Sequence, residues 1–253
     1  DRDVSDYTRE DARLFVSHLT LKGNKTATIR RRLNSLSAIL NYAYAELDLE
    51  KRNPFSRLFI QGEGDDGLRR GVFTNAQLKQ GYEKALTSGS TVKLILPLLG
   101  ETGCRLAEIV GLRHDDIDME RSLIHVRPNN ARRLKTKNSE RLIPQVGYGK
   151  LAMEAAIRRS DGEWLFPQYI KDEKCYATHA SNALNKWLKR DFEGLTAHCL
   201  RHTMRDRLRA VECPLDMIDQ LCGWSSVGGI GVSYGRGYAV DQMRSWMEKV
   251  NIE

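Results

Sequence analysis

The sequence lacks several features that would place it in whole classes of protein. It contains no hydrophobic run long enough to span a bilayer, and it opens on Asp-Arg-Asp rather than on a hydrophobic signal segment. Its five cysteines form no Cys-x-x-Cys pair and are odd in number, which argues against a disulfide framework. No cluster of carboxylate, histidine and cysteine side chains has the spacing of metal ligands. We therefore expect a cytoplasmic protein with no cofactor, no metal and no membrane partner.

Acidic residues are also missing from a long stretch near the N-terminus. Between Ala12 and Ala45 there is no Asp or Glu, whereas six Lys and Arg residues occur there, and the whole chain has a net charge of +7. This distribution favours a polyanionic partner, although an ordinary basic surface would give the same totals. The chain lacks an initial methionine, and we expect that residues precede Asp1 in the natural protein.

The same stretch has the periodicity of a helix. A helix capped by Thr26 would align one apolar stripe for burial, made of Ile29, Leu33, Leu36, Leu40, Ala43 and Leu47. Cationic and amide groups around this helix suit phosphates and base edges, and we predict DNA contacts from Lys25, Arg30, Arg31 and Asn34. A solvated helix face remains the alternative explanation.

Turn-forming residues divide the chain. Asn53-Pro54 ends the helical region, and a glycine-rich and acidic cluster follows at residues 61–67. Thr74 then begins a second series of helices as a predicted cap. We predict a helical DNA-binding domain over residues 1–62, a linker over 63–71 and a second domain over 72–253.

Two short runs in the second domain have the composition of β-strands, namely Ser122–Arg127 and Arg141–Pro144. The predicted fold is therefore mainly α with a small antiparallel β-sheet. From Arg127 to Arg141, six basic residues accompany the single Glu140. We predict DNA contacts from this segment through Arg132, Arg133 and Lys137, with a loose basic loop as the alternative.

Phosphate-binding side chains recur in motifs that lie far apart in the sequence. Arg105 lies in Thr-Gly-Cys-Arg-Leu-Ala-Glu, and His198 and Arg201 share His-Cys-Leu-Arg. Trp224 follows in Gly-Trp-Ser-Ser, and Tyr234 in Ser-Tyr-Gly-Arg. Guanidinium, imidazole and indole groups donate hydrogen bonds to phosphate oxygens, and a phenol is a nucleophile towards phosphorus. The set predicts cleavage of a phosphodiester without a metal ion.

These motifs resemble those of the tyrosine recombinases, and the resemblance covers nearly the whole chain. Arg105 matches the first catalytic arginine of that family, and Glu108 matches its usual acid. His198 and Arg201 match the His-x-x-Arg signature, and Tyr234 matches the nucleophile. The resemblance implies a helical bundle as the N-terminal core-binding domain, followed by a mixed α+β catalytic domain.

The family's chemistry assigns further roles. A lysine on a β-hairpin gives a proton to the leaving 5′ oxygen, and Lys135 is our choice, with Lys137 left open. Trp224 stands where many members have a second histidine, so its indole N–H would donate to a phosphate oxygen. Tyr238 competes with Tyr234 as nucleophile but lies farther from Trp224 than the usual spacing. The predicted catalytic set is Arg105, Lys135, His198, Arg201, Trp224 and Tyr234, and His202 and Arg205 receive no direct role.

The resemblance implies site-specific recombination through a covalent 3′-phosphotyrosyl intermediate, for integration or excision of a phage or mobile element. A type IB topoisomerase and a catalytically silent DNA-binding protein are the alternatives. The expected partner is double-stranded DNA, on which we expect the chain to assemble as a tetramer. A monomer is compatible with these expectations for the protein free of DNA, and an accessory DNA-bending protein is a further candidate partner. The apolar stripe of a C-terminal helix, at Met243, Trp246, Met247 and Val250, would cover either its own core or a neighbouring subunit.

Overall fold

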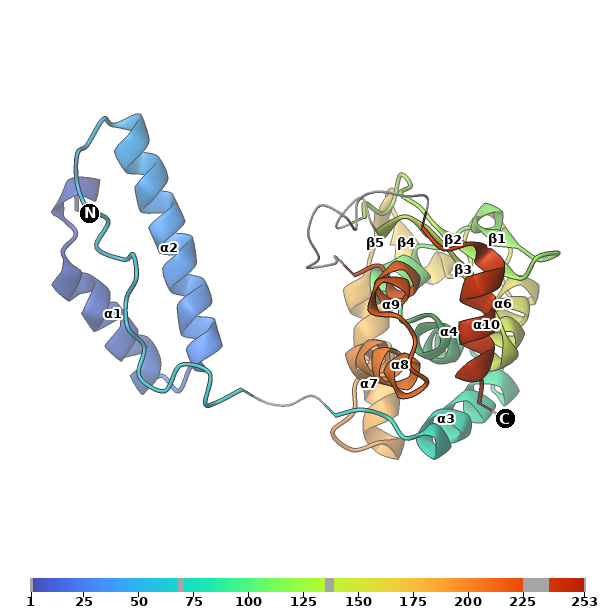
Figure 1. Cartoon of the computed structure of the whole chain (residues 1–253). Helices are drawn as coiled ribbons and strands as arrows, with labels where there is room; N and C mark the ends of the chain where they lie inside the picture. Colours follow the sequence, from blue (N-terminus) through green and yellow to red (C-terminus); the bar gives the residue numbers. More distant parts are fainter. Residues whose placement is uncertain (1, 68–70, 135–138, 225–236, 253) are drawn as a thin grey trace. The chain divides into compact units, whose positions relative to one another are not determined.

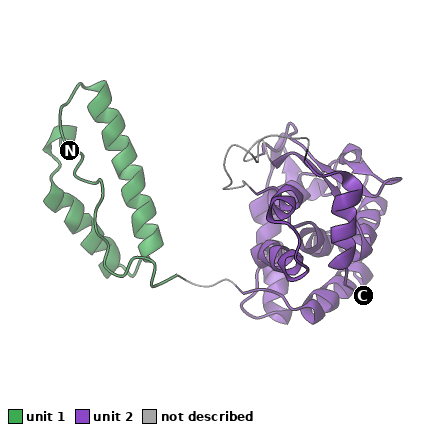
Figure 2. Cartoon of the chain, viewed as in Figure 1, with its two compact units in different colours: residues 1–69 green, residues 70–253 purple. Residues whose placement is uncertain are grey.

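The chain folds into two compact units, residues 1–69 and 70–253, which are coloured separately in Figure 2. The computed structural model describes residues 2–67, 71–134, 139–224 and 237–252. Figure 1 traces the helices and strands of both units along the chain. Among the described residues, no helix is long and apolar enough to cross a membrane.

The first unit is helical. Its elements are the 3-10 turn η1 (Val4–Asp6) and the helices α1 (Arg9–Leu21) and α2 (Thr26–Glu46). Thr8 caps α1 in a capping box with Asp11, which satisfies amides that the first turn leaves unpaired. The predicted stripe of α2 is only partly correct, because Ile29, Leu33 and Leu40 are buried whereas Leu47 is 57% exposed.

The start of α2 differs from the prediction that Thr26 caps it. Thr26 is the first helical residue, and its backbone N–H donates to the carboxylate of Asp66 at 2.7 Å. Its hydroxyl bonds to the same carboxylate, and Glu63 forms an ion pair with Arg30 at 2.6 Å. These hydrogen bonds lower the pKa of Asp66 and of Glu63. Residues 63–66, predicted as part of a linker, thus fold back on the positive end of the helix dipole.

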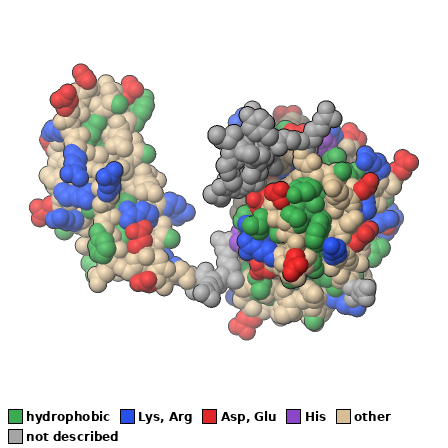
Figure 3. Space-filling view, in the orientation of Figure 1, with side chains coloured by type: hydrophobic (Ala, Val, Ile, Leu, Met, Phe, Trp, Pro, Cys, Tyr) green, Lys and Arg blue, Asp and Glu red, His purple; other side chains and the backbone are tan. Residues whose placement is uncertain are grey.

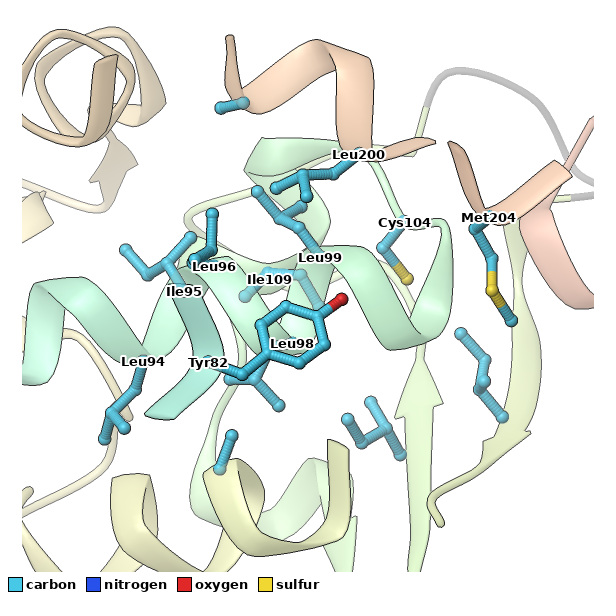
Figure 4. Packing of buried hydrophobic residues seen from close by; sticks show 14 of the residues in the cluster. Tyr82, Leu94, Ile95, Leu96, Leu98, Leu99, Cys104, Ile109, Leu200 and Met204 are labelled. Atoms are coloured by element: carbon cyan, nitrogen blue, oxygen red, sulfur yellow. The ribbon is translucent and has the colours of Figure 1, made fainter. Parts of the chain in front are cut away.

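The second unit is built around a central buried helix, α4 (Ile95–Thr102), all of whose residues are buried. Helices α3 (Asn75–Thr87), α6 (Gly147–Arg158) and α8 (Ala197–Ala210) pack against it. Figure 4 shows leucine and isoleucine side chains gathered around Tyr82 in this core. A Cβ on Gly100 would overlap the Tyr82 hydroxyl, so glycine allows α4 to approach α3.

The remaining elements surround this core. They are η2 (Thr91–Leu94), α5 (Leu106–Val110), η3 (His114–Asp116), β1 (Ile117–Asp118), β2 (Leu123–Val126), β3 (Arg141–Pro144), η5 (Pro167–Tyr169), β4 (Ile170–Lys171), β5 (Lys174–Cys175), α7 (Ala177–Asp191), α9 (Leu215–Cys222) and α10 (Val240–Lys249). Thr74 caps α3 in a capping box with Gln77, as its sequence predicted.

Strands β1, β2 and β3 form an antiparallel sheet in that order, with Ile124 paired to Ile143. Strands β4 and β5 form a separate two-stranded pair. The prediction of a mainly helical fold with a small antiparallel sheet is confirmed. Helix α10 packs on β3 of its own unit and buries Met243, Met247 and Val250 of the predicted stripe, whereas Trp246 is half-buried.

Candidate active site

Arg105 is held at the junction between α4 and α5. Helix α4 ends at Gly103, whose φ of 62° suits glycine, and a Cβ there would lie 2.7 Å from the Cys222 sulfur. Arg105 is the N-cap residue of α5, and its Nη1 donates to Glu108 at 2.7 Å and to Ser139 Oγ at 3.0 Å. Its Nη2 donates to the carbonyl of Gly223 at 3.1 Å. The guanidinium therefore joins three segments that lie far apart in the sequence.

Glu108 is a buried carboxylate shared by two arginines. Besides the bond from Arg105 Nη1, Oε2 accepts the Arg105 backbone N–H at 2.9 Å and Arg141 Nη2 at 3.0 Å. Burial by itself would raise the pKa of Glu108, but the charge of Arg141 and the hydrogen bonds from Arg105 lower it below the ordinary value. Glu108 is therefore ionised and fixes the direction of the Arg105 side chain.

Arg201 lies on α8, and its guanidinium also reaches the carbonyl of Gly223 that Arg105 contacts. Its Nη1 donates to the carbonyls of Gly103 and of Cys222, the latter at 2.5 Å, and its Nη2 lies 3.4 Å from the Gly223 carbonyl. Arg201 is 6% exposed, and burial together with the nearby charge of Arg105 lowers its pKa. The two guanidiniums thus meet at the carbonyl of Gly223, immediately before Trp224.

Trp224 follows the left-handed C-cap of α9 at Gly223, where φ is 64°. Its backbone N–H donates to the carbonyl of Asp219 at 2.9 Å. The indole ring lies 4.6 Å from the guanidinium carbon of Arg201, within cation–π range. The indole Nε1 is buried and has no hydrogen-bond acceptor among the described residues.

His198 lies in the first turn of α8, one turn before Arg201, and Thr196 is the N-cap residue of this helix. The His198 side chain is exposed, and its ring centre lies 5.1 Å from that of His202. The His202 ring in turn lies 6.2 Å from the Trp224 ring. His198, Arg201 and Trp224 are therefore linked through one face of α8.

Three of the predicted site residues, Lys135, Lys137 and Tyr234, lie outside the described residues. Tyr238, the competing nucleophile, is described. Its hydroxyl donates to the Asp216 carboxylate at 2.8 Å, and this hydrogen bond raises the pKa of the phenol. Among the described residues there is no group of three or more His, Cys, Asp or Glu side chains that could hold a metal ion.

The residues predicted to contact DNA in the first unit fall into two groups. Figure 3 shows Lys and Arg side chains gathered on a face of this unit. Of the predicted residues, Arg31 and Asn34 on α2 are exposed. Arg30 instead forms the ion pair with Glu63 described above, and Lys25 donates to the carbonyl of Asp66 at 3.0 Å.

In the second unit Arg133 is exposed, but Arg132 is only 4% exposed. Its Nη2 donates to the carbonyl of Arg127 at 2.7 Å, and burial lowers its pKa. The structure therefore places Arg132 inside the protein, which does not match the surface role predicted for it.

Sequence reasoning missed Arg141 as part of the site. Its guanidinium is 3% exposed and donates to the carbonyl of Leu221 at 2.8 Å and that of Ser139 at 2.6 Å, besides Glu108. It also contacts the sulfur of Cys104 at 3.0 Å. Arg141 thus ties β3 to α5 and to the end of α9. The signal in the sequence was a cation at the start of a strand, which does not reveal that the strand's first side chain points inward.

Comparisons with known proteins agree with this geometry. The profile of the Phage integrase family matches residues 72–237, about two thirds of the chain. The chain belongs to the phage integrase family. Its resemblance to the tyrosine recombinases is confirmed. The tyrosine recombinase XerC of Herpetosiphon aurantiacus is 26% identical over 237 residues, which are 88% of this chain and 74% of the relative. XerD of Rhizobium meliloti is 23% identical over 252 residues, covering 88% and 75%.

Solved structures of integrases share the fold. The Tn1549 transposon integrase, in complex with transposon right end DNA, superposes with a TM-score of 0.72 at 20% identity, covering 98% of this chain and 87% of that one. A lambda integrase, in a tetramer bound to a Holliday junction, gives a TM-score of 0.65 at 16% identity, covering 88% and 66%. The family match and the recombinase relatives, rather than the shared fold, identify this integrase family member as a DNA strand-cleaving and joining enzyme of the tyrosine recombinase type, and they give no support to the topoisomerase alternative.

Proposed function

We propose that this tyrosine recombinase acts at a specific DNA site and uses Tyr234 as its nucleophile. The observation that carries the proposal is the meeting of Arg105, Arg201 and Trp224 around the carbonyl of Gly223, at 3.1 Å and 3.4 Å from the two guanidiniums. Planar guanidinium forks bind two phosphate oxygens at once, which a lysine would not do in the same geometry. The site therefore suits one phosphate of a DNA strand.

The charges at this site suit the reaction as well as the substrate. Arg105, Arg141 and Arg201 carry three positive charges, and Glu108 carries one negative charge, so this group has a formal net charge of +2. Attack on a phosphodiester adds a second negative charge to the one already on its oxygens. Fixed cations that are already in place stabilise this added charge without reorganising.

The proposed reaction proceeds in two balanced steps. The phenol oxygen of Tyr234 attacks the phosphorus, the bond from phosphorus to the 5′ oxygen breaks, and a 3′-phosphotyrosyl ester forms. The phenol proton leaves to a base, for which His198 is our assignment, and Lys135 or Lys137 protonates the leaving 5′ oxygen. In the second step the 5′ hydroxyl of a second strand gives its proton to the lysine and attacks the phosphorus, the bond from phosphorus to the Tyr234 oxygen breaks, and the base returns a proton to Tyr234, which restores the phosphodiester.

The contact made by Tyr238 supports this choice of nucleophile. Its phenol is hydrogen-bonded to Asp216, and the raised pKa disfavours the phenolate form. Tyr234, in contrast, lies ten residues after Trp224, one more than the spacing expected for the family, whereas Tyr238 lies fourteen residues after it. We infer that Tyr238 instead anchors the start of α10 to α9 through its hydrogen bond to Asp216.

The proposed partner is double-stranded DNA, contacted in the first unit by exposed residues such as Arg31 and Asn34. The solved integrase structures that share this fold include one in complex with DNA and a tetramer bound to a Holliday junction. By analogy, we propose that this chain assembles as a tetramer on DNA, with integration or excision of a mobile element as the outcome.

The test is covalent trapping. A pool of nicked duplexes with a randomised sequence around the nick is enriched by binding, and the wild type is incubated with the selected DNA in EDTA. Wild type and Tyr238→Phe should form a protein–DNA adduct that survives denaturation, and Tyr234→Phe should form none. Peptide mapping should place the 3′ phosphate on Tyr234.

A second duplex with a free 5′ hydroxyl then separates the alternatives. Joining of the trapped strand to this duplex supports recombination. Relaxation of a plasmid that lacks the selected site, with no joined product, would support the topoisomerase alternative. Tight binding with no adduct would identify a catalytically silent protein.

A further inference from the structure

Trp224 is contacted by a second guanidinium that the predicted active site does not use. Arg205 lies four residues after Arg201 on α8, so both side chains leave the same face of the helix. The guanidinium carbon of Arg205 lies 4.2 Å from the centre of the Trp224 ring, nearer than that of Arg201 at 4.6 Å. Both distances are within cation–π range.

Arg205 also lies within ion-pair distance of the residue that holds the Trp224 backbone. Its Nη2 lies 3.8 Å from a carboxylate oxygen of Asp219, with side-chain exposures of 23% and 13%. The backbone carbonyl of Asp219 accepts the Trp224 N–H at 2.9 Å. Asp219 therefore holds the backbone of Trp224 by a hydrogen bond, and its carboxylate lies near the Arg205 guanidinium that stacks on the Trp224 ring.

We propose that Arg205 is a positioning residue for the reaction, which orients the indole of Trp224 so that its N–H points at the DNA phosphate. This proposal rests on the proposed function, in which that N–H donates to a phosphate oxygen. The buried Nε1 has no acceptor among the described residues, so no hydrogen bond from them fixes the ring rotation. The ring orientation is therefore set by the two stacked cations together with the His202 edge contact and the packing of the indole against the core.

Arg205 also affects the strength of the donor. A cation over an aromatic face draws electron density from the ring, which makes the indole N–H more acidic and a stronger donor to an anion. Trp224 stands where a charged imidazole would otherwise donate, so a nearby cation restores part of the electrostatic attraction. The effect of Arg205 on cleavage should therefore require the indole N–H.

The experiment uses the full chain with Arg205→Gln, which removes the charge, and Arg205→Lys, which retains it. Arg209→Gln is the matched control, because Arg209 is exposed on the same helix. The first readout is the indole N–H cross-peak of Trp224 in protein labelled with 15N-tryptophan, assigned with Trp224→Phe among the four tryptophans. The second is the single-turnover rate of adduct formation at saturating DNA, on the duplex selected above.

We expect Arg205→Gln to shift the Trp224 cross-peak and to lower the cleavage rate about tenfold with unchanged DNA affinity. Arg205→Lys should keep the Trp224 cross-peak and the cleavage rate close to those of the wild type, and Arg209→Gln should change neither quantity. In the Trp224→Phe background, Arg205→Gln should cost less than about twofold, because the donor on which it acts is gone.

The proposal is overturned by an unmoved Trp224 cross-peak in Arg205→Gln, or by an equal loss of rate in both backgrounds. A change in DNA affinity alone would also overturn it, because Arg205 would then be a DNA contact. If the wild type forms no adduct, the proposed function fails, and the cross-peak still decides whether Arg205 positions Trp224.

Discussion

Replacement of Glu108 by glutamine should destabilise the second unit strongly. The side chains of Glu108 and Arg141 are each 3% exposed, and their atoms lie 3.0 Å apart. Removing one partner of a buried ion pair costs about 3–5 kcal/mol, because the other charge is left buried without compensation. Glutamine keeps one carbonyl oxygen as an acceptor but turns an N–H group towards an arginine. We therefore expect Glu108→Gln to lower the free energy of unfolding by about 3 kcal/mol.

Urea denaturation followed by tryptophan fluorescence measures this loss in the full chain. The four tryptophans all lie beyond residue 69, so the signal reports on the second unit alone. With a urea dependence of about 2 kcal/mol per molar, a loss of about 3 kcal/mol shifts the midpoint down by about 1.5 M. The control is Glu154→Gln, because Glu154 lies 3.8 Å from the exposed Arg158. Its midpoint should shift by less than about 0.3 M.

The pH dependence gives a second measure of the same interaction. The pKa of Glu108 is lowered in the folded protein, so its ionised form adds stability above the ordinary pKa of a glutamate. That stability is lost as the pH falls through the lowered pKa. Glu108→Gln should therefore lose less stability than the wild type on acidification. Equal midpoints for the two proteins at neutral pH would refute the reasoning, since they would mean that the buried carboxylate contributes nothing.

Further predictions concern backbone fit and DNA contact. Gly223→Ala should lower the free energy of unfolding by about 3 kcal/mol, because a Cβ would lie 2.5 Å from Arg141 Nη1 and φ is 64°. Gly194→Ala, with φ of 74° but open space, should cost about 1 kcal/mol in the same urea assay. Arg31→Gln should reduce the salt dependence of DNA binding, as the slope of log K against log salt, by about 1 in anisotropy titrations. Arg30→Gln should leave that slope unchanged, since Arg30 is bound to Glu63, and an equal effect of both would contradict the assignment.

Family and chemistry could be predicted from the sequence because they depend on residue type and spacing. Arg105, His198, Arg201, Trp224 and Tyr234 occur in this order along the chain, and the hydrogen-bonding, proton-transfer or nucleophilic capacities of each side chain follow from its residue type. Their assignment needed no knowledge of which segments touch. The family profile supports the same conclusion over residues 72–237.

Local structure was also predictable where its cause is local. The capping box between Thr74 and Gln77 lies within one helical turn. Strands β2 and β3 are four residues long, and the residue types within each segment are enough to predict a strand. The cap of α2 was not predictable in this way. It comes from Asp66, forty residues later, because a free carboxylate folds back to the unpaired amides of the helix start.

Only the tertiary structure decided which cations are internal. Arg132 and Arg141 belong to the same basic run as the exposed Arg133, yet both are buried. Burial of an arginine requires carbonyl and carboxylate groups from other segments, and for Arg141 these come from Leu221 and Glu108. A sequence states the charge of a side chain, whereas the fold determines which partners surround it and therefore whether it meets DNA or supports the site from within.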